Sequence, residues 1–245
     1  MSEIRIDKLL SEMNYGTRRE IKDAVKSGRI SVDGLVIKKS DLKIDPSKTV
    51  ILYDNKEVVY SEFEYYMLYK PSGVVSATKD NHYKTVIDLI DCEKRKDLFP
   101  VGRLDIDTEG LLFITNDGEL AHNLLAPTKH VAKTYYAEID GTVTNTDAIC
   151  FENGIEFEKD TISKPACLEI LESASISRVY VTIAEGKFHQ IKKMFQALDK
   201  KVVFLKRITM AGISLDEKLS PGEYRRLTDE EIKKLKNPPR WRNTK

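Results

Sequence analysis

The order of strand-like and helix-like segments after residue 60 limits the possible folds most strongly. The runs "HVAKTYYAEI" and "RVYVTIAE" alternate apolar and polar residues with period two, which is typical of half-buried strands. One clear helix follows "EGKFHQ", with apolar residues at i, i+3, i+4 and i+7 counted from Ile191. Strands do not alternate regularly with helices, which disfavours a parallel βαβ sheet. The pattern predicts an α+β domain on a mostly antiparallel mixed sheet with a few flanking helices.

Shorter signals complete this outline. The apolar run "LLFIT" predicts a strand that ends at the turn "NDG", and a helix with Leu120, Leu124 and Leu125 on one face should stop before Pro127. We also expect strands at "EYYMLYK", "VVSAT" and "KVVFLKRITMAGISL", and a short helix at "TVIDLI".

The first 50 residues predict a separate unit of two helices and a hairpin. Thr17 and Glu20 have the spacing of a capping box, and Gly28 can end that helix in a left-handed conformation. Asp33-Gly34 between β-prone flanks indicates a hairpin. The basic residues that fall on or beside the second helix, away from its apolar stripe, suit phosphate contacts. They include Arg18, Arg19, Lys22 and Lys26.

The acidic, polar stretch 54–64 is interpreted as a linker. The expected domains are therefore residues 1–58, a small N-terminal domain, and residues 59–235, a larger catalytic domain. Residues 236–245 form a basic, proline-broken tail that we expect to be frayed.

Charge is distributed unevenly along the chain. Residues 5–39 hold nine Lys and Arg against five Asp and Glu, and residues 186–245 hold sixteen against seven. Residues 40–185 hold fifteen against twenty-six. Two basic ends around an acidic middle suit a polyanion, although charge runs are also common on solvated surfaces.

Composition indicates a globular protein of the cytoplasm. Hydrophobic residues make up 41% and charged residues 32% of the chain, and no apolar run approaches the ~18 residues that a membrane-spanning helix needs. Cys92, Cys150 and Cys167 are odd in number and scattered, which suggests reduced thiols rather than a disulfide framework. We expect no membrane contact.

Three acids crowd the stretch "VGRLDIDTEG", where Asp105, Asp107 and Glu109 follow Arg103. Asp105 and Asp107 could share Mg²⁺ with phosphates, but no histidine or cysteine stands at metal-ligand spacing. A glycosidase-type pair needs two carboxylates with different roles, whereas three on one face of an extended loop would raise each other's pKa together. The residues favour a third interpretation, in which Asp105 alone works and a nearby cation keeps it charged.

A cation and an aromatic ring are available for such a site. Residues 187–207 hold seven Lys and Arg against one acid, with Lys187 and Lys192 at the mouth and first turn of the expected helix. Tyr135 and Tyr136 point to opposite faces of one strand, so one of them can face a pocket. An enzyme that acts on a base lifts it from the stack and sandwiches it, although sheet packing would also explain these rings.

The quoted segments resemble two known families. "RIDKLLSEMNYGTRREIKDAVKSGRISVDG", within residues 4–50, resembles the S4 RNA-binding domain. "VGRLDIDTEGLLFITNDGELAHNLLAP", "KTYYA" and "EGKFHQIKKMF", in this order and after "KPSG", resemble the pseudouridine synthases. The match is to the ribosomal small-subunit (RsuA-type) branch, which carries an S4 domain before its catalytic domain, and it covers about residues 4–235.

The resemblance implies three catalytic residues. Asp105 of "GRLD" would be the catalytic aspartate, and Tyr135 of "KTY" would stack on the target base. Lys192 of "HQIK" takes the place of the basic residue that pairs with the aspartate. Other branches usually have arginine there, so its bidentate geometry is absent here, but lysine is typical of this branch.

The remaining charged residues of these motifs have lesser roles in the resemblance. Arg103 and Lys187 would contact RNA. Asp107 and Glu109 occupy positions that the family pattern leaves open or fills variably, so they are interpreted as bystanders.

The resemblance also implies the reaction. A uridine in ribosomal RNA would be flipped out, its N1–C1′ bond broken, and C5 joined to C1′, without cofactor or metal. Asp105 would either attack C1′ or remove a sugar proton. The expected partner is 16S rRNA or a small-subunit assembly intermediate, bound by a monomer. The alternatives are a 23S rRNA site, a non-catalytic RNA-binding assembly factor, and a Mg²⁺-dependent nuclease that uses the D-x-D pair.

Overall fold

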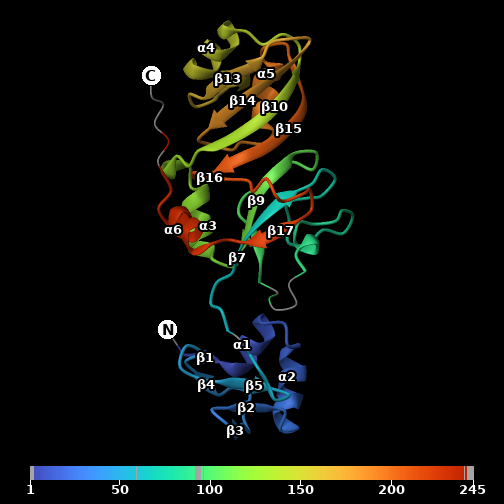
Figure 1. Ribbon diagram of the computed structural model, residues 1–245, viewed down its shortest axis with the longest axis vertical. Helices are drawn as coiled ribbons and strands as arrows, with labels where there is room; N and C mark the ends of the chain where they lie inside the picture. Colours follow the sequence, from blue (N-terminus) through green and yellow to red (C-terminus); the bar gives the residue numbers. More distant parts are fainter. Residues whose placement is uncertain (1–2, 59, 92–94, 96, 240, 242–245) are drawn as a thin grey trace. The chain divides into compact units, whose positions relative to one another are not determined.

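The chain forms two compact units (Figure 1), each built from two separate stretches of the sequence. Unit 1 comprises residues 1–64 and 91–98, and unit 2 comprises residues 65–90 and 99–245. The computed structural model describes residues 3–58, 60–91, 95, 97–239 and 241.

Unit 1 contains the predicted two helices and hairpin. Thr17 Oγ1 accepts from the backbone N–H of Glu20, and the Glu20 carboxylate accepts from the Thr17 N–H at 2.6 Å, so the capping box is confirmed. Gly28 follows that helix with φ +70°, and Asp33 and Gly34 form the hairpin turn with positive φ. The elements are β1 Ile4–Arg5, α1 Ile6–Glu12, α2 Arg18–Lys26, β2 Ile30–Val32, β3 Leu35–Val36, β4 Lys43–Ile44, β5 Ile51–Tyr53 and β6 Lys56–Glu57.

The predicted linker is wrong over residues 54–58. Asp54 and Asn55 both have positive φ and form the turn between β5 and β6, and Val58 is buried in the core of unit 1. The Asp54 carboxylate accepts a hydrogen bond of 2.7 Å from the Arg29 guanidinium. Polar, acidic residues therefore mark a second hairpin here, because a tight turn has the same composition as a short linker.

A mixed sheet forms the frame of unit 2, in the order β13-β14-β10-β15-β9-β7-β17. Every neighbouring pair in this order is antiparallel except β9 and β15, which run parallel. The fold class is thus α+β on a mostly antiparallel mixed sheet, as the sequence predicts. The strands are β7 Tyr65–Lys70, β8 Phe99–Pro100, β9 Glu109–Thr115, β10 Lys133–Asp140, β11 Glu156–Glu158, β12 Thr161–Ile162, β13 Cys167–Glu172, β14 Ile176–Ile183, β15 Lys201–Met210, β16 Ile213–Ser214 and β17 Tyr224–Arg226.

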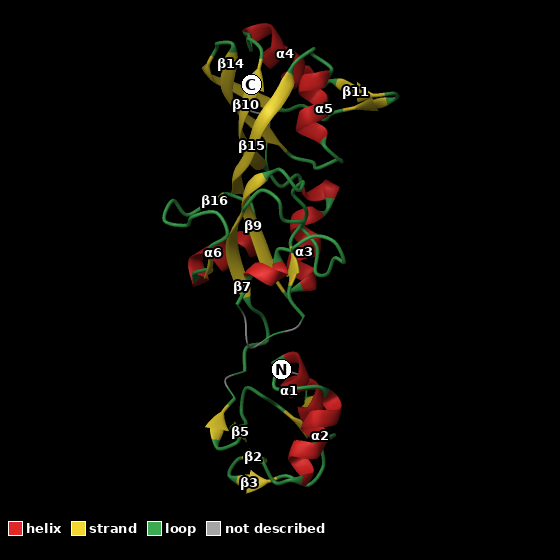
Figure 2. Ribbon diagram, turned by 90° about the vertical axis from the view of Figure 1, so that its right-hand side faces the viewer, coloured by secondary structure: helices red, strands yellow, loops and turns green. Residues whose placement is uncertain are grey.

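Helices pack on both halves of this sheet. One core joins Met67 and Phe113 of the sheet to Leu120 and Leu124 of a helix and Leu235 of another. In the other half, α5 and the β11 hairpin lie to one side of β10 and β15 (Figure 2). The helices are α3 Gly118–Leu125, α4 Asn145–Asn153, α5 Gln190–Gln196 and α6 Asp229–Lys236, with 3-10 turns at Ile87–Leu89 and Pro127–Lys129.

Several local predictions need correction. "VVSAT" is not a strand, since Val75 makes only an isolated bridge to Thr85. The long run after α5 breaks at Ala211, which has positive φ, into β15 and β16. Helices α4 and α6 were not expected. The tail is not frayed at Trp241, whose backbone N–H donates to His130 O at 3.2 Å, while residues 240 and 242–245 lie outside the described residues.

Cys150 and Cys167 are free thiols, and Cys92 lies outside the described residues. Within the described part of the chain, none of the helices is both long and apolar enough to span a bilayer.

Candidate active site

Lys70, at the end of β7, holds the loop that carries Asp105. Its side chain is fully buried, and Nζ donates to the carbonyl oxygens of Asp105 at 3.0 Å and Thr108 at 2.8 Å, with further bonds to Pro71 and Ile106. Buried carbonyls need such donors, so one ammonium fixes the backbone of residues 105–108. Burial lowers the pKa of Lys70 to about 8, although nearby carboxylates, Asp107 first, oppose the shift.

The residues before Asp105 are fixed by close packing. Gly102 has φ +82°, and a Cβ atom there would lie 2.8 Å from the Leu125 side chain. Ser76 Oγ donates to Leu104 O at 2.9 Å and accepts from Leu104 N at 3.0 Å. The "GRLD" stretch is therefore a rigid turn between β8 and β9, which presents the Asp105 side chain to a cavity.

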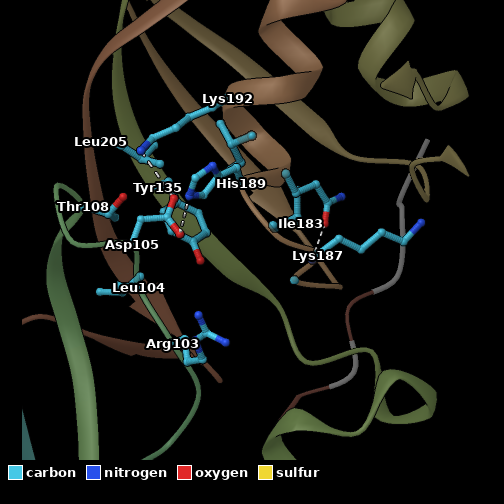
Figure 3. A pocket seen from close by; sticks show the side chains of 13 residues that line it. Arg103, Leu104, Asp105, Thr108, Tyr135, Ile183, Lys187, His189, Lys192 and Leu205 are labelled. Carbon is cyan, nitrogen blue, oxygen red and sulfur yellow. Dashed lines mark hydrogen bonds and ion pairs between the residues drawn. The ribbon is translucent and has the colours of Figure 1, made fainter. Parts of the chain in front are cut away.

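Two groups from the segment that begins α5 reach Asp105 (Figure 3). Lys192 Nζ lies 3.4 Å from Asp105 Oδ2, and His189 Nε2 lies 3.6 Å from Asp105 Oδ1. Lys192 also lies 2.6 Å from Asp107 Oδ1, so one ammonium serves two carboxylates. Burial opposes ionisation of Asp107, but the hydrogen bond and charge of Lys192 outweigh it and hold the Asp107 pKa below its ordinary value.

Tyr135 on β10 completes the cavity. Its side chain is 7% exposed and lines a space of about 70 Å³ together with Asp105 and Lys192. Ile183 and Leu205 add apolar walls from the two strands that flank β10. The cavity thus combines a carboxylate, a cation and an aromatic ring between apolar walls, an arrangement that suits a flat, uncharged base next to a reacting sugar.

Tyr136 points to the opposite face of the sheet. Its ring contacts Tyr180 and Phe204 in edge-on geometry, with centroids 6.2 and 6.1 Å away. The prediction that the two tyrosines lie on opposite faces of one strand, so that one can face a pocket, is confirmed, and the residue that lines the cavity is Tyr135.

The structure brings five of the predicted site residues to one place. Arg103 and Lys187 line the same cavity as Asp105, Tyr135 and Lys192, and the amine of Lys187 points away from Asp105 (Figure 3). The other four lie in unit 1, exposed on α2. They are Arg18, Arg19, Lys22 and Lys26.

Asp107 and Glu109, interpreted as bystanders, differ in the structure. Asp107 shares the Lys192 ammonium, as described above, at a shorter distance than Asp105 does. Glu109 accepts a hydrogen bond of 3.3 Å from Tyr69 and does not line the cavity.

The sequence alone does not single out three residues of the site. Lys70 belongs to "KPSG", to which the family resemblance gives no role, and His189 has no metal-ligand spacing in the sequence. Thr108 lines the cavity with a hydroxyl that is buried and lacks a hydrogen-bond partner among the described residues. Among those residues, no three His, Cys, Asp or Glu side chains are grouped to hold a metal ion.

Comparison with known proteins agrees with this geometry. Residues 64–197 match the family model for RNA pseudouridylate synthase, and residues 4–50 match that for the S4 domain. The chain belongs to the RNA pseudouridylate synthase family. It is an isomerase that converts uridine in RNA to pseudouridine, and an S4 RNA-binding domain precedes its catalytic domain.

Relatives cover nearly the whole chain. An uncharacterized RNA pseudouridine synthase, YtzG, of Bacillus subtilis is 46% identical over 96% of this chain and 99% of its own length. Ribosomal small subunit pseudouridine synthase A of Escherichia coli K12 is 37% identical over 94% and 98%. A crystal structure of a pseudouridylate synthase has 35% identity, covers 95% of this chain and 99% of that one, and superimposes with a TM-score of 0.66.

Proposed function

We propose that Asp105, Tyr135 and Lys192 are the catalytic residues and that the substrate is a uridine of small-subunit ribosomal RNA. Tyr135 stacks on the extruded base, and Lys192 pairs with the Asp105 carboxylate and orients it toward C1′ of the ribose. The N1–C1′ bond breaks, N1 takes up a proton, and the C5–C1′ bond forms as the hydrogen at C5 leaves as a proton. Atoms and charge therefore balance without a co-reactant.

The separation of 3.4 Å between Lys192 Nζ and Asp105 Oδ2, in a cavity that Tyr135 also lines, carries this proposal. The two charged residues stand 87 positions apart in the sequence, and the loop and helix that carry them are each fixed by their own contacts. Partly exposed ion pairs add little to the stability of a protein. An ion pair at the mouth of a small cavity is therefore better explained by a role in the reaction than by a role in folding.

Two routes are open for the Asp105 carboxylate. As a nucleophile it would bond to C1′ and leave the ribose hydrogens in place. As a base it would remove the hydrogen at C2′ and pass through a glycal. Substrate with deuterium at C2′ separates the routes, since only the second breaks that bond and gives a primary isotope effect on single-turnover rates.

The relatives' names support the choice of ribosomal RNA. Several proteins named ribosomal small subunit pseudouridine synthase A are 36–39% identical to this chain over at least 94% of its length. Carbodiimide-stop mapping of rRNA from cells with and without the gene tests the choice. The expected result is that one pseudouridine of the small-subunit rRNA is missing from cells without the gene. If a pseudouridine of the large-subunit rRNA is missing instead, the substrate is 23S rather than 16S rRNA.

Tritium release from RNA labelled at C5 of uridine tests the catalytic assignment. Asp105→Asn keeps the size of the side chain but loses its charge, and it should fold, bind RNA and release no tritium. Asp140→Asn, at the end of β10 and outside the cavity, is the matched control and should keep normal release. Near-normal release by Asp105→Asn would remove Asp105 from the mechanism. RNA cleavage that stops on addition of EDTA would point to a nuclease.

We further propose that the S4 domain, residues 1–58, positions the RNA through the exposed basic face of α2. Arg18, Arg19, Lys22 and Lys26 would contact phosphates there without reading sequence. The protein would act in the cytoplasm as a monomer on rRNA or a small-subunit assembly intermediate. Cell fractionation and sedimentation of the purified protein test these two points.

A further inference from the structure

A second, larger cavity adjoins the catalytic one in unit 2. It has a volume of about 610 Å³ and shares Arg103, Tyr135, Gly186 and Lys187 with the smaller cavity. A molecule in the catalytic cavity can therefore continue directly into the larger one. The larger cavity has apolar walls but is also lined by five basic side chains.

Two of these basic side chains are buried beside each other. Lys133 is 8% exposed and Arg207 is 2% exposed, and the two carry like charges. The sheet places them together, because Arg207 of β15 is the cross-strand partner of Tyr135, and Lys133 lies two residues before Tyr135 on the same face of β10. Burial, and next the charge of Arg207, lower the pKa of Lys133 to about 8.

The side chains of Lys133 and Arg207 donate hydrogen bonds to neutral groups. Lys133 Nζ donates to Val131 O at 3.1 Å, and Arg207 Nε donates to Leu111 O at 2.7 Å, so both partners are neutral carbonyls. Glu185 is the acid among the described residues that line the cavity. Its charge acts on Lys133 and opposes the lowering of the Lys133 pKa, but its Oε1 already accepts from Gln190 Nε2 at 2.5 Å and from the backbone N–H of Lys164 at 2.9 Å.

Arg207 keeps an unused donor. Its Nη2 is buried and has no hydrogen-bond partner among the described residues. A buried donor left unpaired costs free energy, and a buried charge costs more unless an anion pairs with it. A purely structural arginine would be expected to use its full set of donors, whereas one that waits for an anion leaves a donor free.

We propose that Lys133 and Arg207 form the floor of an anion site that binds a backbone phosphate of the RNA next to the extruded uridine. Phosphate offers the geometry that a guanidinium binds best, and one doubly hydrogen-bonded anion would offset both buried charges. Arg103, Lys164 and Lys187 line the rest of the cavity and attract the strand. The proposal rests on the proposed function, because Tyr135 is taken to hold the base in the adjoining cavity.

Nuclear magnetic resonance of the lysine ε-methylene groups tests the site without catalysis or substitution. Saturating inorganic phosphate, and separately saturating RNA, should raise the pKa of Lys133 from about 8 toward the ordinary lysine value. A Lys133 pKa that RNA leaves unchanged would overturn the proposal. A response to inorganic phosphate alone would show a site for a free anion and would also overturn the assignment to RNA.

Neutral linkages in the RNA identify the phosphate. Single methylphosphonates placed in turn at each linkage around the target uridine should weaken binding to the wild-type protein about 10- to 100-fold at one position. Lys133→Gln should bind the unmodified RNA correspondingly more weakly and be insensitive at that position. Lys201→Gln, on the same strand as Arg207 but outside the cavity, should behave as wild type. Equal sensitivity of wild type and Lys133→Gln at every linkage would contradict the proposal.

The outcomes separate this site from the proposed function. Tritium release by the wild-type protein tests the reaction, and it can fail while a methylphosphonate still weakens binding at one linkage. Conversely, normal release with no response of Lys133 to RNA would leave the function standing and remove the phosphate site. Arg207 is not replaced in these experiments, because its bond to Leu111 O makes it part of the fold.

Discussion

Lys192 Nζ lies 2.6 Å from Asp107 Oδ1, which is closer than Lys192 comes to Asp105. The ammonium thus divides its charge between two carboxylates, one of which is largely exposed. Asp107 therefore competes with Asp105 for the Lys192 ammonium.

Asp107→Asn should show how much this sharing matters. The amide cannot hold the ammonium by charge, so Lys192 would turn fully to Asp105, and the rate of tritium release should change by less than about tenfold in either direction. Lys192→Met should instead lose at least about a hundredfold in single-turnover rate, because Asp105 loses its cation. A larger loss in Asp107→Asn than in Lys192→Met would make Asp107 the working carboxylate.

Lys70→Met should disable the enzyme without touching the cavity lining. Four carbonyl oxygens lose their shared donor, each at a cost of about 1–3 kcal/mol if it stays buried, so the loop of residues 105–108 should loosen. Hydrogen exchange at the Thr108 amide, which donates to Asp105 O, should accelerate, and tritium release should fall with it. Lys201→Met is the control on an exposed lysine. Normal exchange together with normal turnover would deny Lys70 this role.

Replacing Tyr135 distinguishes stacking from hydroxyl chemistry. Tyr135→Ala should weaken binding of substrate RNA by about 5- to 150-fold, since stacking on an aromatic ring contributes ~1–3 kcal/mol per base. Tyr135→Phe keeps the ring, so its affinity should remain near that of the wild type. Equal losses of affinity in both variants would mean that the hydroxyl, rather than the ring, contacts the RNA.

Lys133→Met should stabilise the protein in phosphate-free buffer. The folded-state pKa of about 8 lies below the ordinary 10.5. Below pH 8 the charged lysine therefore lowers the free energy of unfolding of the wild type. The variant should therefore exceed the wild type by about 1–3 kcal/mol in free energy of unfolding at pH 7. This advantage should shrink between pH 8 and 10.5, where the folded wild type has released the proton and the unfolded chain has not. Urea denaturation at a series of pH values measures the difference, and an advantage that grows with pH would contradict the prediction.

Salt dependence tests the basic face of α2. Arg18→Gln combined with Arg19→Gln should lower the slope of log affinity against log salt by about 0.7–0.9 for each phosphate that these arginines neutralise. The intrinsic rate at saturating RNA should stay the same, because these residues lie in unit 1. Lys56→Gln, in the second hairpin, serves as a control that also removes positive charge from unit 1. An unchanged slope in the double variant would show that the RNA does not contact this face.

Local signals were enough to predict much of this molecule. The capping box at Thr17, the turn at Asp33-Gly34 and the period-two alternation of β10 and β14 each depend on residues a few positions apart, and each appears as expected. The prediction is wrong where one composition fits two structures: the polar, acidic residues around Asp54 fit a linker and a hairpin turn equally well, and they form the turn. Helix α4 has no apolar stripe that periodicity could detect, although its start at Thr144 carries a capping box.

The site was predictable in its residue types but not in its contacts. Asp105, Tyr135 and Lys192 stand in motifs that a family resemblance can locate. Their meeting depends on the parallel pairing of β9 with β15, which joins Gly110 to Arg207 and for which the local sequence gives no signal. The roles of Lys70 and of the unpaired Arg207 donor depend on burial, so they became visible only with the fold.

Unit 1 includes the distant segment 91–98, so the N-terminal stretch alone is not the whole unit. Arg95 reaches from that segment to the Ser61 carbonyl, and to the Met13 sulfur at 3.7 Å. A fragment that stops near residue 64 would lack Arg95 and would leave Met13 and the Ser61 carbonyl without these contacts. Unit 1 therefore cannot be excised as one continuous segment. Transfer of this unit to another protein would require both segments, joined by an artificial linker.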